Sequence, residues 1–132
     1  MSRTLFINLA STDLTAAGDF YSQLGFGFNP QFSSDTTRCI VLADHVYLML
    51  LTTAKFSDFS PNPVINSQQQ TEVLNCLSCE SKAEVDLLVQ KAVKAGGKTY
   101  NQPQDHGFMY AHGFQDLDGH VWELVFMDGL LG

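Results

Sequence analysis

The spacing of apolar residues along the first half of the chain switches between short strand-like runs and a helix-like stripe. Residues 5–9 form a short apolar run that ends at Ser11-Thr12-Asp13, which predicts a strand followed by a helix N-cap. A stripe with the 3.6-residue period of an amphipathic helix follows, formed by Leu14, Ala17, Phe20, Tyr21 and Leu24. Gly25 is expected to end that helix. Further strands are expected at 26–29, 38–43 and 46–53, with a tight turn at Asp44-His45 between the last two.

The second half repeats this order after a polar segment. Residues 56–70, rich in Pro, Asn and Gln, are predicted to be a loop with at most one helical turn after Thr53. A strand is expected at 71–79, followed by a capping box from Ser81 to Glu84 and an apolar helical stripe that ends at Gly96-Gly97. The remaining predicted elements are strands at 98–101, 108–115 and 120–127, a polar loop at 102–107 and a hairpin turn at 117–119.

The two halves therefore share the order strand, helix and three strands. A short identity supports the repeat, because His45-Val46 precedes Tyr47 and His120-Val121 precedes Trp122. We predict one α+β domain over residues 1–132, with module one at about 1–56, a linker at about 57–70 and module two at about 71–128. The alternative is a single ferredoxin-like sandwich with mixed strand order.

Composition narrows the classes of partner. The net charge of −7 works against binding to nucleic acid or to an anionic membrane surface. No apolar run approaches the roughly 18 residues of a membrane span. The first residues lack the apolar core of an export signal, and the three cysteines are an odd, sparse set, so we expect a cytoplasmic protein with reduced thiols.

Two segments resemble the signatures of a known superfamily. Residues 114–124 read FQDLDGHVWEL, similar to F-x-D-P-D-G-x-x-x-E-L, and residues 13–26 read DLTAAGDFYSQLGF, similar to D-L-x-x-x-x-x-F-Y-x-x-L-G-F. Both are signatures of the vicinal oxygen chelate superfamily of glyoxalases, bleomycin resistance proteins and extradiol dioxygenases. The resemblance implies two tandem βαβββ modules whose curved mixed sheets enclose a cleft, and it implies a homodimer.

The resemblance also implies four metal-ligand positions, one on the first and one on the last strand of each module. These positions fall on Phe6, on Met49 or Leu48, on Leu74 and on Glu123. Only Glu123 offers a donor that suits Mg²⁺, Mn²⁺, Zn²⁺ or Fe²⁺. We therefore expect no metal or other cofactor. The alternative is a divalent metal held by shifted ligands such as His106, His112 and Glu123, in a lyase or dioxygenase.

Glu123 is the main candidate for chemistry. Strand alternation places it between Val121 and Val125, where an unpaired carboxylate would be costly. It is interpreted either as a general base or substrate anchor, or as a structural carboxylate that is hydrogen-bonded. His112 and Tyr110 are its candidate catalytic partners because they lie on the neighbouring hairpin strand, although backbone groups could equally satisfy both side chains.

The expected function is binding of a small, partly apolar organic molecule. The candidate ligand-binding residues are Phe6, Asn8, Met49 and Leu74, a mainly apolar lining with few polar groups. Whether a reaction is catalysed stays open, and a dimeric scaffold without a ligand is a third alternative. Cys76 and Cys79 fall on a predicted strand and point to opposite faces, which argues against a redox or zinc motif.

Overall fold

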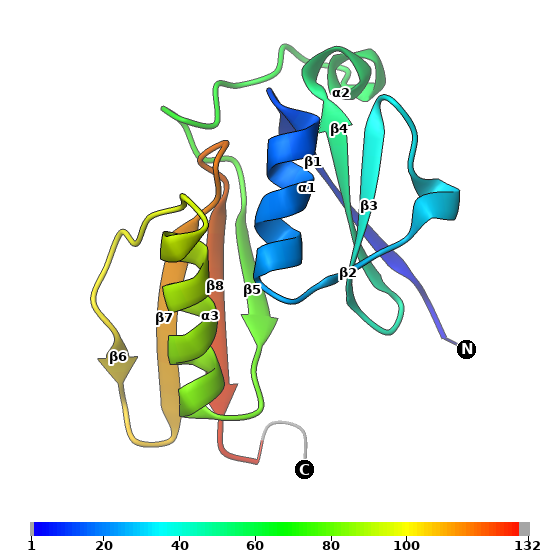
Figure 1. Ribbon diagram of the computed structural model, residues 1–132. Helices are drawn as coiled ribbons and strands as arrows, with labels where there is room; N and C mark the ends of the chain where they lie inside the picture. The colour runs from blue at the N-terminus through cyan, green and yellow to red at the C-terminus, as the bar shows by residue number, and fades with distance from the viewer. Residues whose placement is uncertain (1, 130–132) are drawn as a thin grey trace. The chain divides into compact units, whose positions relative to one another are not determined.

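The computed structural model describes residues 2–129, which divide between Asn66 and Ser67 into two compact units (Figure 1). Unit 1 contains β1 (Leu5–Ser11), α1 (Leu14–Gln23), β2 (Gly27–Phe28), the 3₁₀ turn η1 (Pro30–Phe32), β3 (Thr37–Ala43), β4 (Val46–Thr52) and α2 (Thr53–Phe59). Unit 2 contains β5 (Leu74–Ser78), α3 (Lys82–Lys94), β6 (Gln104–Asp105), β7 (Met109–Gln115) and β8 (Val121–Met127). None of the helices among the described residues is long and apolar enough to cross a membrane.

Both units have the same sheet topology. The strand order is β1-β4-β3-β2 in unit 1 and β5-β8-β7-β6 in unit 2. In each sheet the first strand is parallel to the last strand of its unit, and the other neighbours are antiparallel. The predicted tandem βαβββ fold of the α+β class is confirmed.

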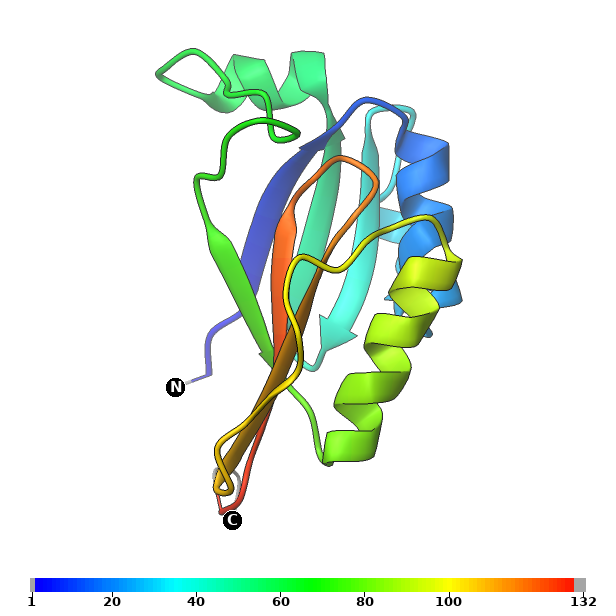
Figure 2. The ribbon, with the colours of Figure 1, turned by 90° about the vertical axis from the view of Figure 1, so that its left-hand side faces the viewer.

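Local signals in the sequence position the long helix of each unit. The Asp13 side chain accepts a hydrogen bond from the Ala16 amide at 3.0 Å at the start of α1, and the Ser81 hydroxyl accepts one from the Glu84 amide at 3.0 Å at the start of α3. Each helix lies against one face of the sheet of its own unit (Figure 2). The side chains that α1 and α3 bury are Ala17, Phe20, Tyr21, Val85, Val89 and Ala92.

Alternation along the strands gives each sheet a helix face, covered by α1 or α3, and a second face, here called the helix-free face because neither α1 nor α3 covers it. In β4, Leu48 and Leu50 are completely buried on the helix face, and Met49 points the other way. In β8, Leu124 is buried on the helix face, and Glu123 lies on the helix-free face. The strand register therefore selects Met49, not Leu48, as the residue that shares a face with Phe6 and Asn8.

Two expectations about secondary structure are wrong. The segment after Thr52 forms the seven-residue helix α2 instead of at most one turn, because the Thr52 hydroxyl caps it at the Lys55 amide and the Lys55 Nζ donates to Thr37 Oγ1 at 2.7 Å. The strand expected at 98–101 is reduced to one bridge between Lys98 and Gln115, and the paired segment is β6 instead.

Candidate functional site

The helix-free face of unit 1 carries an aromatic pair beside a polar residue. Phe6 of β1 stacks on Tyr47 of β4, with ring centroids 5.3 Å apart and planes 16° apart, and 48% of Phe6 is exposed. Two residues further along each strand, Asn8 pairs with Met49. The predicted ligand-binding residues of unit 1, namely Phe6, Asn8 and Met49, therefore share one face, and their ligand role stays a prediction.

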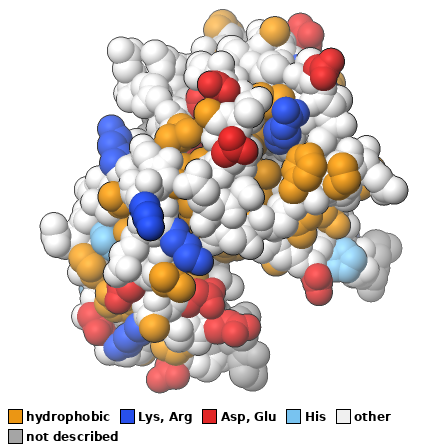
Figure 3. All heavy atoms as spheres, viewed as in Figure 1, with side chains coloured by type: hydrophobic (Ala, Val, Ile, Leu, Met, Phe, Trp, Pro, Cys, Tyr) orange, Lys and Arg blue, Asp and Glu red, His pale blue; other side chains and the backbone are white. Residues whose placement is uncertain are grey.

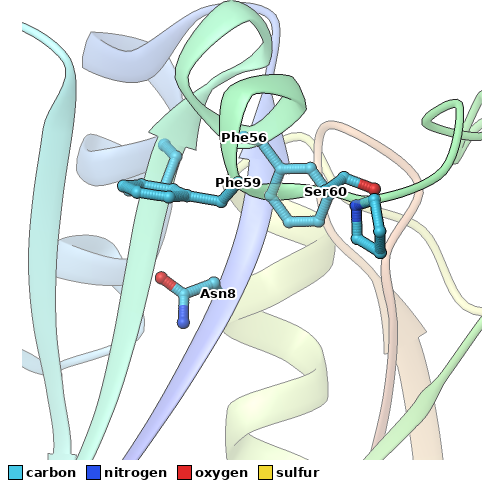
Figure 4. Close-up of a pocket in the computed structure, with 6 residues that line it drawn as sticks. Asn8, Phe56, Phe59 and Ser60 are labelled. Carbon is cyan, nitrogen blue, oxygen red and sulfur yellow. The ribbon is translucent and has the colours of Figure 1, made fainter.

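A pocket of about 500 Å³ lies at one end of this face. It is lined by Asn8, Leu51, Phe56, Phe59, Ser60 and Pro61. Figure 4 shows the two phenylalanines, from α2, and Asn8, from β1, around this space. Helix α2 is fastened to the sheet by Lys55 and by the Thr53 hydroxyl, which donates to the Ser11 carbonyl at 3.3 Å.

The polar side chains that line the pocket differ in how many of their hydrogen-bonding groups already have partners within the protein. The Ser60 hydroxyl donates to the Asn62 carbonyl at 2.6 Å and accepts from the Asn62 amide at 3.2 Å. Asn8 Nδ2 donates to the Phe6 carbonyl at 3.3 Å, and the amide oxygen of Asn8 accepts no hydrogen bond from the described residues. Asn8 is therefore the polar side chain of the pocket with the most hydrogen-bonding capacity left for a ligand.

The helix-free face of unit 2 holds a different set of side chains. Glu123 of β8 pairs with Cys76 of β5 on one side and with Gly113 of β7 on the other. Leu74, which is 69% exposed, lies on the same face two residues before Cys76. Cys76 is exposed, whereas Cys79 is buried, as expected for cysteines that point to opposite faces.

Tyr100 reaches across this face from the loop before β6. Its hydroxyl donates to the Trp122 carbonyl at 3.2 Å, and its ring lies against Gly113. Burial, and then the nearby Glu123 carboxylate and Cys76, raise the pKa of Tyr100. Burial, and then Glu123, raise the pKa of the Cys76 thiol. Tyr100, Cys76 and Glu123 thus form one cluster, of which sequence reasoning identified only the carboxylate.

The predicted partnership of His112 and Tyr110 with Glu123 is wrong. The register pairs Gly113 with Glu123, so the two side chains lie on the helix face. His112 Nε2 is 2.9 Å from the Asn101 carbonyl, and the Tyr110 hydroxyl donates to Asp86 of α3 at 2.6 Å. The hydrogen bond to Asp86, followed by burial, raises the pKa of Tyr110 to about 12.

Tyr110 belongs instead to a polar contact at the start of α3. Lys82 Nζ lies 5.8 Å from the centre of the Tyr110 ring and forms an ion pair with Asp105 at 3.1 Å. Figure 3 shows acidic and basic side chains close together over this end of unit 2. These contacts join α3, β6 and β7 through the Tyr110 side chain.

The residues present do not fit the metal site that the resemblance implies. Phe6, Met49 and Leu74 occupy three of the four positions, and neither a phenyl, a thioether nor an isobutyl group binds a hard or borderline cation. The alternative set is not assembled either, because His112 and Glu123 lie on opposite faces of the sheet. Within residues 2–129, no three His, Cys, Asp or Glu side chains gather as metal ligands.

The surroundings of Cys76 and Cys79 both favour the neutral thiol over the thiolate. Burial, and then Glu84, raise the pKa of Cys79 to about 12, and the pKa of Cys76 is raised as well. Reactive and metal-binding cysteines need a stable thiolate, which both environments disfavour.

Comparison with known proteins gives a consistent match. The sequence profile of the Glyoxalase/Bleomycin resistance protein/Dioxygenase superfamily matches residues 3–124. A hypothetical protein from S. aureus is 28% identical, with a TM-score of 0.80 over 96% of this chain and 94% of that one. A glyoxalase/bleomycin resistance protein/dioxygenase family enzyme from Burkholderia phytofirmans is 19% identical, with a TM-score of 0.79 over 96% and 100%.

The fold is also that of a bleomycin resistance determinant encoded on the transposon Tn5. That protein is 18% identical, with a TM-score of 0.67 over 96% of this chain and 99% of that one. No match was found among curated proteins.

Proposed function

Since the chain belongs to the Glyoxalase/Bleomycin resistance protein/Dioxygenase superfamily, we propose that it binds a small, partly apolar organic molecule without the divalent metal of metal-using members. The pocket of unit 1 carries this proposal. Its volume falls in the range of small-molecule sites, and its lining combines aromatic rings with few polar groups, the usual composition of such sites.

Asn8 sets the orientation of the ligand in this proposal. One end of its amide is bonded to the Phe6 carbonyl, and the other end points to no protein partner among the described residues. A ligand with a flat apolar body and one N–H or O–H group fits between Phe56 and Phe59 and can donate to Asn8. One protein of the same fold is a bleomycin resistance determinant, which supports sequestration of an organic compound as the role.

Glu123 is proposed as the ligand-contacting carboxylate of unit 2, as an anchor or a general base. It is half-buried between Val121 and Val125, and no described residue gives it a hydrogen bond or ion pair. A carboxylate in that position is costly unless it finds a partner.

We also propose that the protein is a cytoplasmic homodimer. Strands β1 and β5 are edge strands of their sheets, and such edges are commonly covered in native assemblies. Light scattering at micromolar concentration tests this, with twice the 14.6 kDa chain mass as the expected result and a pure monomer as the contrary one.

The binding proposal is tested by titrating ¹⁵N-labelled protein with indole, a neutral apolar ring with one N–H donor. We expect saturable shifts of the Asn8, Phe56 and Phe59 amide signals. Asn8→Leu should weaken binding about fivefold, the weight of one neutral hydrogen bond of ~1 kcal/mol. Phe59→Ser should weaken it about tenfold through lost apolar contact.

Phe32→Ser is the matched control, because Phe32 is another exposed phenylalanine of unit 1 that does not line the pocket. It should leave the affinity for indole unchanged. Indole shifts that are absent, or that all three variants reduce equally, would count against the pocket as a binding site.

A further inference from the structure

The Glu123 cluster, defined as Glu123, Cys76 and Tyr100, is brought together by three separate segments. Glu123 and Cys76 are neighbours across the parallel β8–β5 pair, so their side chains leave the sheet on the same face. Tyr100 comes from the loop after α3, and its hydroxyl binds the backbone carbonyl of the residue before Glu123. The cluster lies beside apolar side chains of the same face, the exposed Leu74 and the buried Val121.

Gly113 makes room for the Tyr100 ring. A Cβ atom at position 113 would collide with the phenol group and would lie 2.7 Å from the Trp122 carbonyl oxygen. A glycine is therefore required where the tyrosine crosses β7, although its backbone angles are ordinary. Gly113 pairs with Glu123 in the strand register. The phenol of Tyr100 therefore fills the space above Gly113 that a side chain would otherwise occupy, next to the Glu123 carboxylate.

The loop that carries Tyr100 is held against β7 on both sides of the residue. Lys98 and Gln115 exchange two backbone hydrogen bonds, of 3.1 and 2.7 Å. The backbone carbonyl of Asn101 is hydrogen-bonded to His112 Nε2 at 2.9 Å. The side-chain oxygen of Asn101 accepts a hydrogen bond from the Gly113 amide at 3.4 Å. The phenol is thus fixed by its neighbours before any ligand arrives, as a preorganised site requires.

The cluster presents mainly hydrogen-bond acceptors to a ligand. The Tyr100 hydroxyl gives its single proton to the Trp122 carbonyl, which leaves only oxygen lone pairs toward a ligand. Glu123 accepts only, and no Lys, Arg or His among the described residues forms an ion pair with it. The raised pKa values of Tyr100 and Cys76 keep both groups neutral at pH 7. The cluster therefore offers the oxygen acceptors of Glu123 and Tyr100, one negative charge and an aromatic ring, and its only donor is the weak S–H group of Cys76.

We propose that the Glu123 cluster recognises a protonated amine attached to an apolar group. The ammonium group of such a ligand supplies hydrogen-bond donors and a positive charge to the Glu123 carboxylate, which has no such partner among the described residues. The Tyr100 ring adds a cation–π contact. Leu74 and Val121 contact the apolar group of the ligand. Tyr100 is in this account the specificity-determining residue. The inference rests on the ligand role proposed for Glu123 and names the chemistry of that ligand.

Benzylamine and benzyl alcohol separate charge from shape, because both have the same ring and the same chain length. We expect benzylamine to shift the amide signals of Cys76, Gly113 and Glu123 in a saturable way, with benzyl alcohol at least tenfold weaker. Glu123→Gln keeps the side-chain shape and should weaken benzylamine at least tenfold. Tyr100→Phe keeps the ring and should weaken it about threefold.

Glu80→Gln is the matched control, since Glu80 is an exposed glutamate of the same unit and its change alters the net charge equally. It should leave benzylamine binding unchanged. Equal affinity for the amine and the alcohol would overturn the amine proposal, and so would an equal effect of the two Glu→Gln variants. The comparison of the two probes on the parent protein stands even if a variant does not fold. Indole binding at Asn8 is a separate readout, so failure of the amine site is distinct from failure of the proposed function.

Discussion

The helix-free faces of the two units share one scaffold and differ in their chemistry. At equivalent places in the register, unit 1 has Asn8 beside Met49, and unit 2 has Cys76 beside Glu123. Helix α2 follows β4 and forms a wall of a pocket in unit 1, whereas the loop of Tyr100 crosses the sheet of unit 2. A repeated fold thus provides a neutral aromatic pocket and a charged cluster from the same strand positions.

The helix faces, by contrast, are built alike. Leu48 and Leu50 in β4 have counterparts in Trp122 and Leu124 of β8, and all four are buried. The buried residues of the helix faces therefore maintain the same fold in both units. The chemical difference between the units lies in the neighbouring strand residues, which point to the helix-free faces. Four predictions test this contrast, ordered by the size of the expected effect.

The two faces of β4 should differ most in their response to truncation. Leu48→Ala removes a completely buried side chain and should lower the free energy of unfolding by about 3 kcal/mol. Met49→Ala, on the half-buried helix-free face, should cost about 1 kcal/mol. Urea unfolding measures both, and equal losses would contradict the assignment of faces.

Gly113→Ala should be the next largest effect, at about 2 kcal/mol, because the added methyl group meets the Tyr100 phenol and the Trp122 carbonyl. Tyr100→Ala in the same chain should restore part of the loss. Gly18→Ala in α1 is the control, since the nearest atom lies at an ordinary 3.5 Å and alanine favours helix by up to ~1 kcal/mol. A neutral Gly113→Ala variant would show that Tyr100 does not need the glycine.

Tyr110→Phe should cost about 1 kcal/mol at pH 7, because it removes the hydrogen bond to Asp86. The folded-state pKa of Tyr110, about 12, lies above its ordinary value near 10. The stabilisation is therefore complete below pH 10 and is lost as the pH rises toward 12. Unfolding measured at several pH values should show the parent and the variant converging over that interval. A constant difference would contradict the role of this hydrogen bond.

Removal of metal should have the smallest effect. EDTA should change the Tm by less than about 1 °C, because three of the four family ligand positions lack a donor. The combined variant Phe6→His, Met49→Glu and Leu74→His should instead gain stability from added Zn²⁺. One equivalent of iron, zinc, nickel or manganese retained by the parent after dialysis would favour the lyase or dioxygenase alternative.

Local signals in the sequence were sufficient to predict most of the fold. The Asp13 cap, the Ser81 cap and the turn at Gly119 each act over a few residues, and each is present in the structure. The sequence pattern underestimates the length of helix α2 because Lys55 stabilises this helix through a hydrogen bond to Thr37, a residue distant in sequence. Tyr100 was missed for the same reason, since its partner is the Trp122 carbonyl.

The hairpin in the sequence already indicates that His112 and Tyr110 face away from Glu123. Counting outward from the turn pairs Gln115 with Val121 and therefore Gly113 with Glu123. A glycine opposite a candidate carboxylate in a strand indicates that something else occupies the space above it. The identity of that group, Tyr100, depends on the course of a loop that no local pattern predicts.

One NMR titration of EDTA-treated, ¹⁵N-labelled protein with indole and then benzylamine tests the central claim, that the two helix-free faces bind different ligand chemistries without metal. We expect indole to shift the signals of Asn8, Phe56 and Phe59, and benzylamine to shift those of Cys76, Gly113 and Glu123. Shifts that require added metal, or that both probes produce at the same residues, would contradict it.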